Sequence, residues 1–179
     1  MPTARDPRPL TGEPPALDLL NTRWHHEGTV EDLLTDTEGL AVWLAANGLG
    51  EFTADEATLR HTLRARDALK AAVDGPPGEG AAAVDAVLEH GRIRPTLGLQ
   101  GPGERVEFED PAWGPAWLAA RNYLELLATA PDRIRSCSHG SCILHFFDTS
   151  RNGTRRWCSM ATCGNRAKAS RHYARTRES

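Results

Sequence analysis

The chain has 179 residues, of which 40% are hydrophobic and 25% are charged, and its net charge at neutral pH is −3. This length can bury a sizeable core, and the composition is ordinary for a globular protein. No apolar run approaches the roughly 20 residues of a membrane-spanning helix, and the first residues lack the apolar stretch of a signal peptide, so we expect a cytoplasmic protein with no membrane partner.

The net charge hides two segments of opposite sign. Residues 132–179 contain ten Lys or Arg against three Asp or Glu, a net charge of +7, so residues 1–131 carry −10. Clustered cations create a local field that the net charge averages away, which indicates an anionic partner, although a solvated surface is the alternative. We expect two domains, an acidic one at 1–131 and a basic one at 132–179.

The first 15 residues are rich in proline and charge and are expected to form an extended lead-in. The ordered body is expected to begin at the sequence ALDLLNT, which ends in Asn21 and Thr22. These two side chains could cap a helix or form a turn, or they could bind a small molecule.

Capping signals introduce the first two predicted helices after that point. Thr35 and Glu38 have the spacing of a capping box before an apolar segment, and Thr53 and Glu56 repeat the signal. The second helix is expected to run to about residue 73. A shorter helix rich in Ala and Val is expected to end near residue 89.

A β-hairpin is predicted between Arg92 and Glu109, around the turn-forming sequence Gly101-Pro102-Gly103. A helix is predicted next, over residues 111–130, because large apolar residues recur there at helical spacing. These residues are Trp113, Trp117, Leu124 and Leu127. We interpret the two tryptophans as core residues rather than as an aromatic ligand cage.

The four cysteines carry the clearest chemistry, with the pattern C-x4-C-x15-C-x4-C. Thiolate is a good ligand for zinc, and two cysteine pairs separated by a loop can close a tetrahedral site. The predicted ligands of one structural Zn²⁺ are Cys137, Cys142, Cys158 and Cys163.

The sequence between the two pairs predicts a second hairpin. Residues 143–147 (ILHFF) and 154–158 (TRRWC) are β-prone, and Asn152-Gly153 is a favoured turn between them. A helix is expected after Cys163. The predicted fold is therefore α+β and mainly helical, with a helical N-terminal domain that contains a small β-hairpin, followed by a treble-clef-like or zinc-ribbon-like hairpin and helix.

Other uses of the cysteines fit the sequence less well. Two disulfides conflict with a reducing compartment, a redox pair prefers C-x2-C spacing, and a catalytic zinc keeps an open position that four thiolates would fill. His139, His145 and His172 could replace a ligand, but we expect them to be surface residues or to lie beside the ligands.

The sequence from FFDTSRNGTRRWCSM to ATCGNRAKASRHYAR closely resembles the bacterial CGNR zinc-finger family, whose signature here is Cys163-Gly164-Asn165-Arg166. The N-terminal segments LDLLNTRW and DLLTDTEGLAVWLAANGL look like the ABATE-type domain that precedes this finger in stress-induced transcription regulators. The resemblance implies a C-terminal zinc finger assigned to DNA binding, joined to an N-terminal domain. The N-terminal match supports the fold of that domain more than any activity.

The first functional hypothesis is a transcription regulator whose finger binds duplex DNA, mainly at phosphates. RNA is the second partner considered, with Trp157 and Tyr173 available for stacking. The third hypothesis is a protein-interaction module, in which the basic finger docks on an acidic partner or on the acidic body. The expected nucleic-acid contacts are Arg151, Arg155, Arg156, Arg166, Lys168, Arg171 and Arg175.

Enzyme function ranks last, because the chain lacks the common nucleophile, phosphate-loop and dinucleotide motifs. For residues 1–131 we expect a domain that senses a small-molecule effector or forms a homodimer. This expectation follows the usual pairing of reader and sensor in regulators.

Overall fold

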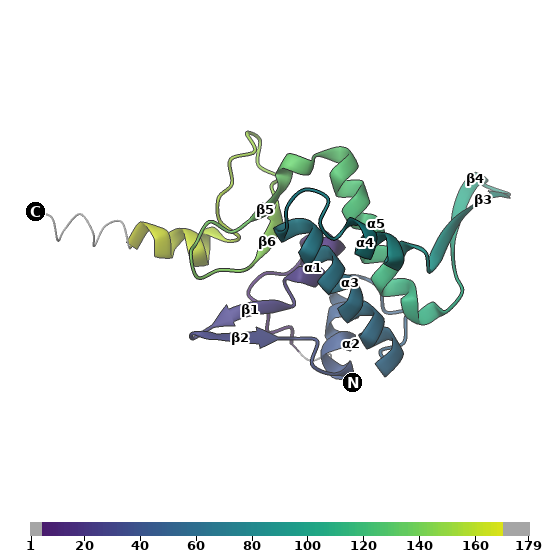
Figure 1. The fold of residues 1–179 in the computed structure, drawn as a ribbon, viewed down its shortest axis with the longest axis horizontal. Coiled ribbons are helices and arrows are strands. Elements are labelled where there is room, and N and C mark those ends of the chain that lie inside the picture. Colours follow the sequence, from purple (N-terminus) through teal and green to yellow (C-terminus); the bar gives the residue numbers. More distant parts are fainter. Residues whose placement is uncertain (1–4, 170–179) are drawn as a thin grey trace, which may run out of the picture.

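The computed structural model describes residues 5–169, so Arg171, His172, Tyr173 and Arg175 lie outside the described part. In Figure 1 a group of helices forms the centre of the molecule. A long β-hairpin projects from one end, and the helical residues near the C-terminus project from the other.

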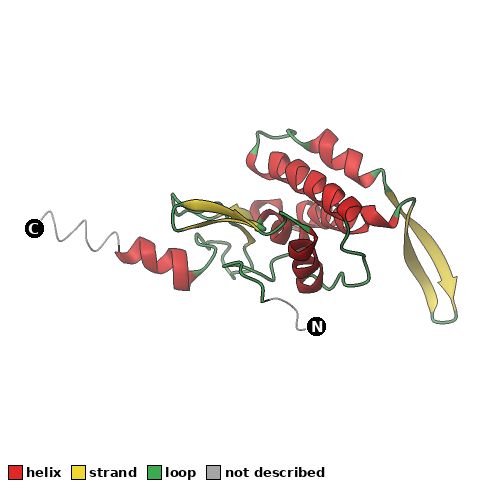
Figure 2. Ribbon diagram, turned by 90° about the horizontal axis from the view of Figure 1, so that it is seen from below, coloured by secondary structure: helices red, strands yellow, loops and turns green. Residues whose placement is uncertain are grey.

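Four helices pack together in the centre: α1 (Pro15–Leu20), α3 (Glu56–Asp74), α4 (Ala81–Leu88) and α5 (Gly114–Thr129). Figure 2 shows the helices gathered between the C-terminal helical residues and the projecting hairpin. The apolar sequence of α1 is almost wholly buried, because α3 and α5 both pack against it. The predicted helices near 56–74, 81–88 and 114–129 are confirmed. The ordered part of the chain begins before the predicted start at ALDLLNT.

The lead-in has no helix or strand over residues 5–14, yet it enters the core. The Arg8 side chain is fully buried and donates to the Asp18 carboxylate in α1 at 2.6 Å and to the Asp6 carboxylate at 2.7 Å. Asn47 donates to the same Asp18 carboxylate at 2.9 Å. The lead-in is therefore fixed to α1 by a buried ion pair.

The capping residues of two helices differ from the predicted ones. The N-cap of α2 (Thr37–Ala46) is Asp36, whose carboxylate accepts a hydrogen bond from the Gly39 amide, and the N-cap of α3 is Asp55. The prediction of Thr35 and Thr53 as caps was wrong. A carboxylate also gains from the positive end of the helix, so the aspartates next in sequence cap these helices instead.

The projecting hairpin consists of β3 (Gly91–Gly98) and β4 (Gly101–Phe108), paired antiparallel from Gly91↔Phe108 to Gly98↔Gly101. The hairpin is confirmed, but its turn lies at residues 99–100. Gly101-Pro102-Gly103 belongs to β4. This strand tolerates Pro102, which has no N–H to donate, because among residues 5–169 β4 has a partner on one edge only and its other edge is open.

The two tryptophans at the start of α5 are buried, as predicted. The Trp113 ring is stacked between His61 and His90, with ring centroids 3.8 and 3.6 Å apart. Trp117 donates its indole N–H to the Leu88 carbonyl at 2.9 Å. Leu124 and Leu127, in contrast, are 44% and 38% exposed and lie outside the core.

A hairpin that the sequence did not predict follows α1. Strands β1 (Arg23–His26) and β2 (Thr29–Asp32) pair antiparallel, and Glu27 and Gly28 between them both have positive φ. Such a turn matches the twist of two adjacent strands. The strands lack an apolar face, which is why the alternation of residue types did not indicate them.

The C-terminal part pairs differently from the prediction. Strand β6 (His145–Phe147) lies beside β5 (Ile134–Ser136), and residues 154–158 form no strand. The predicted pairing of 143–147 with 154–158 was therefore wrong. The turn at Asn152-Gly153 does occur, with Gly153 at a φ of 61°.

After this turn the chain forms a π-helix (Met160–Gly164) and continues as an α-helix over residues 165–169. The predicted helix after Cys163 is confirmed within the described residues. The fold is α+β with small hairpins and a C-terminal hairpin, four-cysteine cluster and helix, as predicted. Among residues 5–169, the helices are too short or too polar to cross a membrane.

Candidate metal centre

The first cysteine pair lies on the connection between β5 and β6. The Cys137 amide donates to the Leu144 carbonyl at 2.9 Å, which extends the β5–β6 pairing by one residue. The Cys142 amide donates to the His139 carbonyl at 2.8 Å and closes a turn within the connection. The backbone therefore holds the two cysteines at opposite ends of one short loop.

The second pair lies at the start of the C-terminal helical segment. Cys163 belongs to the π-helix, and Cys158 lies two residues before that helix. The Ser138 amide donates to the Arg156 carbonyl at 2.9 Å, and the Cys158 amide approaches the Cys137 sulfur at 3.4 Å. These contacts bring the second pair next to the first.

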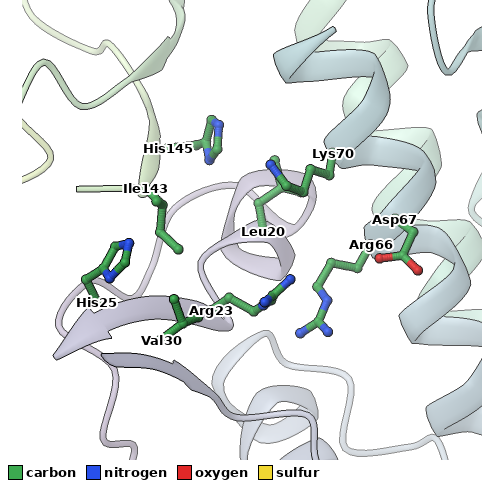
Figure 3. Close-up of a pocket in the computed structure, with 9 residues that line it drawn as sticks. All are labelled: Leu20, Arg23, His25, Val30, Arg66, Asp67, Lys70, Ile143 and His145. Atoms are coloured by element: carbon green, nitrogen blue, oxygen red, sulfur yellow. The ribbon is translucent and has the colours of Figure 1, made fainter. Parts of the chain in front are cut away.

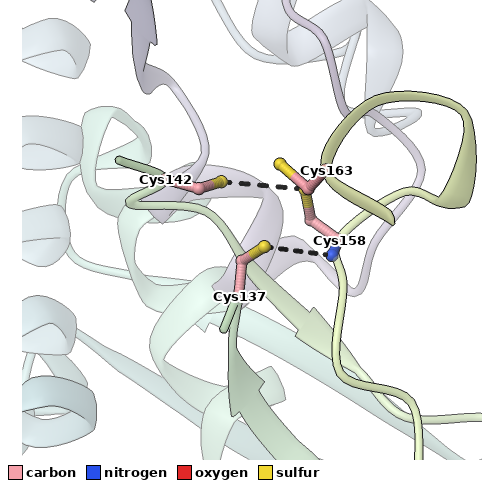
Figure 4. Close-up of side chains that lie close together, drawn as sticks. All are labelled: Cys137, Cys142, Cys158 and Cys163. Atoms are coloured by element: carbon pink, nitrogen blue, oxygen red, sulfur yellow. Dashed lines mark hydrogen bonds between the residues drawn. The ribbon is translucent and has the colours of Figure 1, made fainter. Parts of the chain in front are cut away.

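The four sulfur atoms form one cluster (Figure 4), and all of them lie within 4.8 Å of one another. The Cys158 sulfur is 3.7 Å from the Cys142 sulfur and 3.6 Å from the Cys163 sulfur. A tetrahedral site with Zn–S bonds of about 2.3 Å has S–S edges of about 3.8 Å. A disulfide bond, by contrast, is only about 2.05 Å long. The four cysteines are thus positioned to bind one metal ion, and their donor set and spacing fit a structural zinc.

The thiols influence one another strongly. A hydrogen bond from Cys158 lowers the pKa of Cys142 to about 5, and the same contact raises the pKa of Cys158 above its ordinary value. Burial raises the pKa of Cys163 to about 11. The Cys142 thiolate is therefore stabilised beside Cys158 and Cys163, which retain their protons. Because zinc binds thiolates, its binding must release the remaining protons.

Arginines brace the loop that follows β6. Arg133 donates to the carbonyls of Asp148 and Ser150 at 2.7 and 2.8 Å, and Arg135 donates to the Gly153 carbonyl at 3.0 Å. The buried Asp148 carboxylate accepts the Ser150 and Arg155 amides at 2.9 Å. A hydrogen bond with the Ser150 side chain, together with these two amides, holds the pKa of Asp148 below its usual value. These hydrogen bonds hold the loop so that Cys158 lies at the cluster, although residues 154–158 form no strand.

Arg155 is turned inward. Its guanidinium lies 4.2 Å from the centre of the Phe146 ring and donates to the carbonyls of Trp157 and Cys158. It also approaches the Glu13 carboxylate at 3.4 Å. Within the described chain this arginine contacts the finger backbone and the body.

The other predicted nucleic-acid contacts within residues 5–169 are exposed. Arg151 lies in the loop, and Arg156 lies with its guanidinium 5.3 Å from the centre of the Trp157 ring. Arg166 and Lys168 project from the helical residues directly after Cys163. Arg171 and Arg175 lie outside the described residues.

The histidines divide in their roles. His139 is half-buried and its Nδ1 lies 3.1 Å from the Ser141 hydroxyl, close to the cluster, as predicted. His145 is only 5% exposed, and its Nε2 lies 2.7 Å from the Asp74 carboxylate in α3. The prediction that His145 is a surface residue or lies beside the ligands was wrong, because β6 turns this ring toward the body. His172 lies outside the described residues.

Polar contacts that the sequence did not reveal join the cysteine-bearing segment to the body. Asn21, fully buried after α1, donates to the His145 carbonyl and accepts the His145 amide, each at 2.8 Å. Glu13 accepts the Phe147 amide at 2.9 Å. The alternative of helix or turn formation for Asn21 is partly correct, since it ends α1, but its amide bonds to β6. The sequence signal for this contact was limited to a polar residue, Asn21, at the predicted end of an apolar segment.

Comparison with known families accounts for nearly the whole chain. Residues 13–130 match the family described as ABATE, "Putative stress-induced transcription regulator", and residues 133–176 match the CGNR zinc finger. No curated protein matches the chain. The second match contains all four clustered cysteines and the Cys163-Gly164-Asn165-Arg166 signature. The chain therefore belongs to the ABATE family, and it carries a CGNR zinc finger whose four cysteines are positioned to bind one metal ion.

Proposed function

We propose that this protein is a cytoplasmic transcription regulator that binds duplex DNA through a finger held together by one structural Zn²⁺. The observation that carries this proposal is the position of the cluster. Cys163 lies in the first helical turn of a basic segment, so a metal on the four thiols fixes the start of the helix that presents Arg166 and Lys168. In this proposal Cys137, Cys142, Cys158 and Cys163 are the zinc ligands.

The attraction for DNA comes from the exposed cations. Four thiolates and one Zn²⁺ carry a formal charge of −2, which reduces the +7 of residues 132–179 to about +5. The candidate phosphate contacts are Arg151, Arg156, Arg166, Lys168, Arg171 and Arg175. Arg155 was among the predicted contacts, but its bonds to the finger backbone support a bracing role in addition.

A salt titration tests DNA binding. If about four to six phosphates are neutralised, the slope of log affinity against log salt is about −4 to −5 for the zinc-loaded full chain on duplex DNA. The double variant R166A/K168A should make that slope less negative by about 2, because each lost phosphate contact removes about 0.9. No saturable binding at low salt, with zinc loaded, would overturn the proposal.

A matched control separates local contacts from general charge. R60A/R105A removes two exposed cations from α3 and β4, far along the chain from the cysteines, and lowers the net charge equally. It should leave the salt slope unchanged. If both double variants weaken binding equally, the finger has no special role in the attraction.

RNA is the alternative nucleic acid, supported by the half-buried Trp157 beside Arg156. Competition between duplex DNA and structured RNA of equal length distinguishes the two. We infer DNA as the partner, so the RNA should compete poorly; preferential RNA binding would replace the DNA assignment.

Docking of the basic segment on the acidic body is also part of the proposal. The contacts of Asn21, Glu13 and Asp74 with residues 145–155 support an intramolecular interface. Within residues 5–169, the exposed cations Arg151, Arg156, Arg166 and Lys168 are not among these contacts, so docking and DNA binding can occur together. We also propose a division at residue 131/132, with residues 1–131 as the sensing or dimerising part. The separate family matches to residues 13–130 and 133–176 support this division. We further propose that the chain has no catalytic activity, because the description of its family names a transcription regulator and no enzyme.

A further inference from the structure

A cavity of about 170 Å³ lies where the body meets the finger. Its walls come from α1, the β1–β2 hairpin, α3 and the residues that lead into β6, so segments far apart in the sequence surround it. Figure 3 shows the guanidinium groups of Arg23 and Arg66 on one side of this cavity and the His145 ring on another.

Two polar atoms of the cavity lining have no hydrogen-bond partner. Within residues 5–169 four buried side-chain nitrogens lack one, and two of these are Arg66 Nε and His145 Nδ1. Arg66 is 7% exposed and His145 is 5% exposed. Buried polar groups are nearly always hydrogen-bonded, so two such atoms beside one cavity mark a place where a polar ligand can supply the hydrogen bond that the chain does not.

The partners of Arg66 show why its Nε is left free. Both of its terminal nitrogens donate to the Asp32 carboxylate, at 2.7 and 2.8 Å, and one also donates to the Thr22 hydroxyl at 2.9 Å. This pairing fixes the guanidinium plane. The remaining N–H is a preoriented donor, which suits an oxygen acceptor.

The charges of the lining favour an anion. Arg23, Arg66 and Lys70 line the cavity, and Asp67 is the one acidic residue among the lining side chains. Asp32 and Asp74 lie behind these bases and hold them, since Lys70 and His145 both contact Asp74.

Apolar side chains form the rest of the wall, namely Leu20, Val30 and Ile143. The volume is close to that of a cavity that holds one benzene molecule, about 150 Å³. A ligand with one charged end and a compact hydrocarbon body fits these walls.

We propose that this cavity binds a small monocarboxylate with an apolar body as an effector. The carboxylate accepts hydrogen bonds from Arg66 Nε and Arg23, and the body lies against Leu20, Val30 and Ile143. His145 belongs to β6 and is held by Asn21 and Asp74, so the ligand contacts both the body and the finger. Binding therefore stabilises the docked arrangement, because the complete site exists only when the two are together.

Binding is tested on the zinc-loaded full chain by calorimetric titration with benzoate, butyrate, benzamide and inorganic phosphate. Benzoate and butyrate should bind saturably with one site. Benzamide lacks the negative charge, so its affinity should be lower by a factor of about ten or more. The reason is that a hydrogen bond between two charged groups becomes a weaker one to a neutral acceptor. Equal affinity for benzoate and benzamide, or stronger binding of phosphate, would overturn the proposal.

Two variants locate the site. I143W places a large ring at a partly exposed position of the wall and should abolish benzoate binding, whereas L97W, at the distant tip of the β3–β4 hairpin, should leave it unchanged. R23Q removes an exposed donor and should weaken binding about tenfold. Benzoate binding that I143W does not alter would contradict the assignment.

The effector role rests on the proposed function, but the binding test does not. Benzoate titration needs no DNA, so a chain that binds benzoate and no DNA retains the cavity assignment and loses the regulator role. A chain that binds DNA and neither carboxylate loses only the cavity assignment.

Discussion

The side-chain amide of Asn21 forms two hydrogen bonds with the backbone of His145, each 2.8 Å long. One is donated by the amide nitrogen and the other is accepted by the amide oxygen, so the side chain acts as a neighbouring strand would. It joins the end of α1 to β6 across 124 positions of the sequence. This pair links the ABATE part of the chain to the finger.

The substitution N21A should destabilise the protein by about 2–3 kcal/mol, because it leaves the amide and the carbonyl of a buried residue without partners. Chemical denaturation of the zinc-loaded protein measures this. N165A, which removes a 3.3 Å hydrogen bond from an exposed asparagine, is the control and should change stability by less than about 0.5 kcal/mol. Equal effects of the two variants would show that the Asn21 contact does not join the two parts.

Removal of one thiol should abolish zinc binding at the cluster. C158S deletes the sulfur that contacts both Cys142 and Cys163, and we expect the zinc content to fall from one ion per chain to none. S159A, at the next position, should retain one zinc ion. Full zinc occupancy in C158S would contradict the four-thiolate site.

Substitution of the adjacent Arg155 and Arg156 should affect different properties, namely stability for Arg155 and DNA binding for Arg156. R155A removes hydrogen bonds to two backbone carbonyls and the contact with Phe146, so it should lower stability by about 1–3 kcal/mol. R156A removes an exposed side chain and should cost less than about 0.5 kcal/mol, while its effect on the DNA salt slope is a change of about 0.9. Denaturation and salt titration of both variants measure these effects, and the reverse pattern would show that Arg156 braces the finger.

The stack of His61, Trp113 and His90 should make stability depend on pH. Burial lowers the pKa of His61 below its ordinary value of 6.5, and the nearby Arg60 and Arg64 act in the same direction against Asp110. The unfolded chain therefore binds this proton more tightly than the folded chain. The contribution of His61 to stability is fully present above about pH 6.5 and is lost as the pH falls.

Tryptophan fluorescence during denaturation, with zinc in excess, follows this change between pH 7.5 and about 5.5. H61Q should lose part of the pH dependence, whereas H26Q, at an exposed site on β1, should keep it. Identical pH profiles for wild type and H61Q would refute the assignment to His61.

The cysteine cluster could be predicted because ligand chemistry limits the spacing of its residues. Thiolates must converge on one point, so the pattern of Cys137, Cys142, Cys158 and Cys163 is informative without knowledge of the fold. The helices were predictable for a similar reason, since an apolar face repeats along each helix. The sequence pattern predicts the observed structure in these two cases because a local rule, ligand spacing or helical repeat, is enough to determine it.

Pairing between strands could not be predicted in the same way. The β-propensity of residues 143–147 does not choose between residues 134–136 and 154–158 as partners. Arg155 settles the choice, because its amide bonds to Asp148 and its side chain turns inward over Phe146. β1 and β2 are largely exposed on both faces, so they have no apolar alternation to detect.

The contacts between the body and the finger depend on tertiary structure alone. Asn21, Arg66 and His145 come from three distant segments, and nothing in their local sequences indicates that they meet. Which of their polar atoms have a hydrogen-bond partner, and which lack one, is known only from the burial and the distances in the folded chain. The candidate effector cavity is for this reason a finding of the structure.

The most direct test of the account is the dependence of DNA binding on zinc. The affinity of the full chain for one duplex is measured by fluorescence anisotropy at fixed salt, first with zinc loaded, then after removal of zinc by a chelator, and finally after zinc is restored. We predict saturable binding of the loaded protein, a loss of about tenfold or more without zinc, and recovery on its return, because the thiolate cluster fixes the start of the basic helix. Equal affinity with and without zinc, or no binding in either state, would contradict the account.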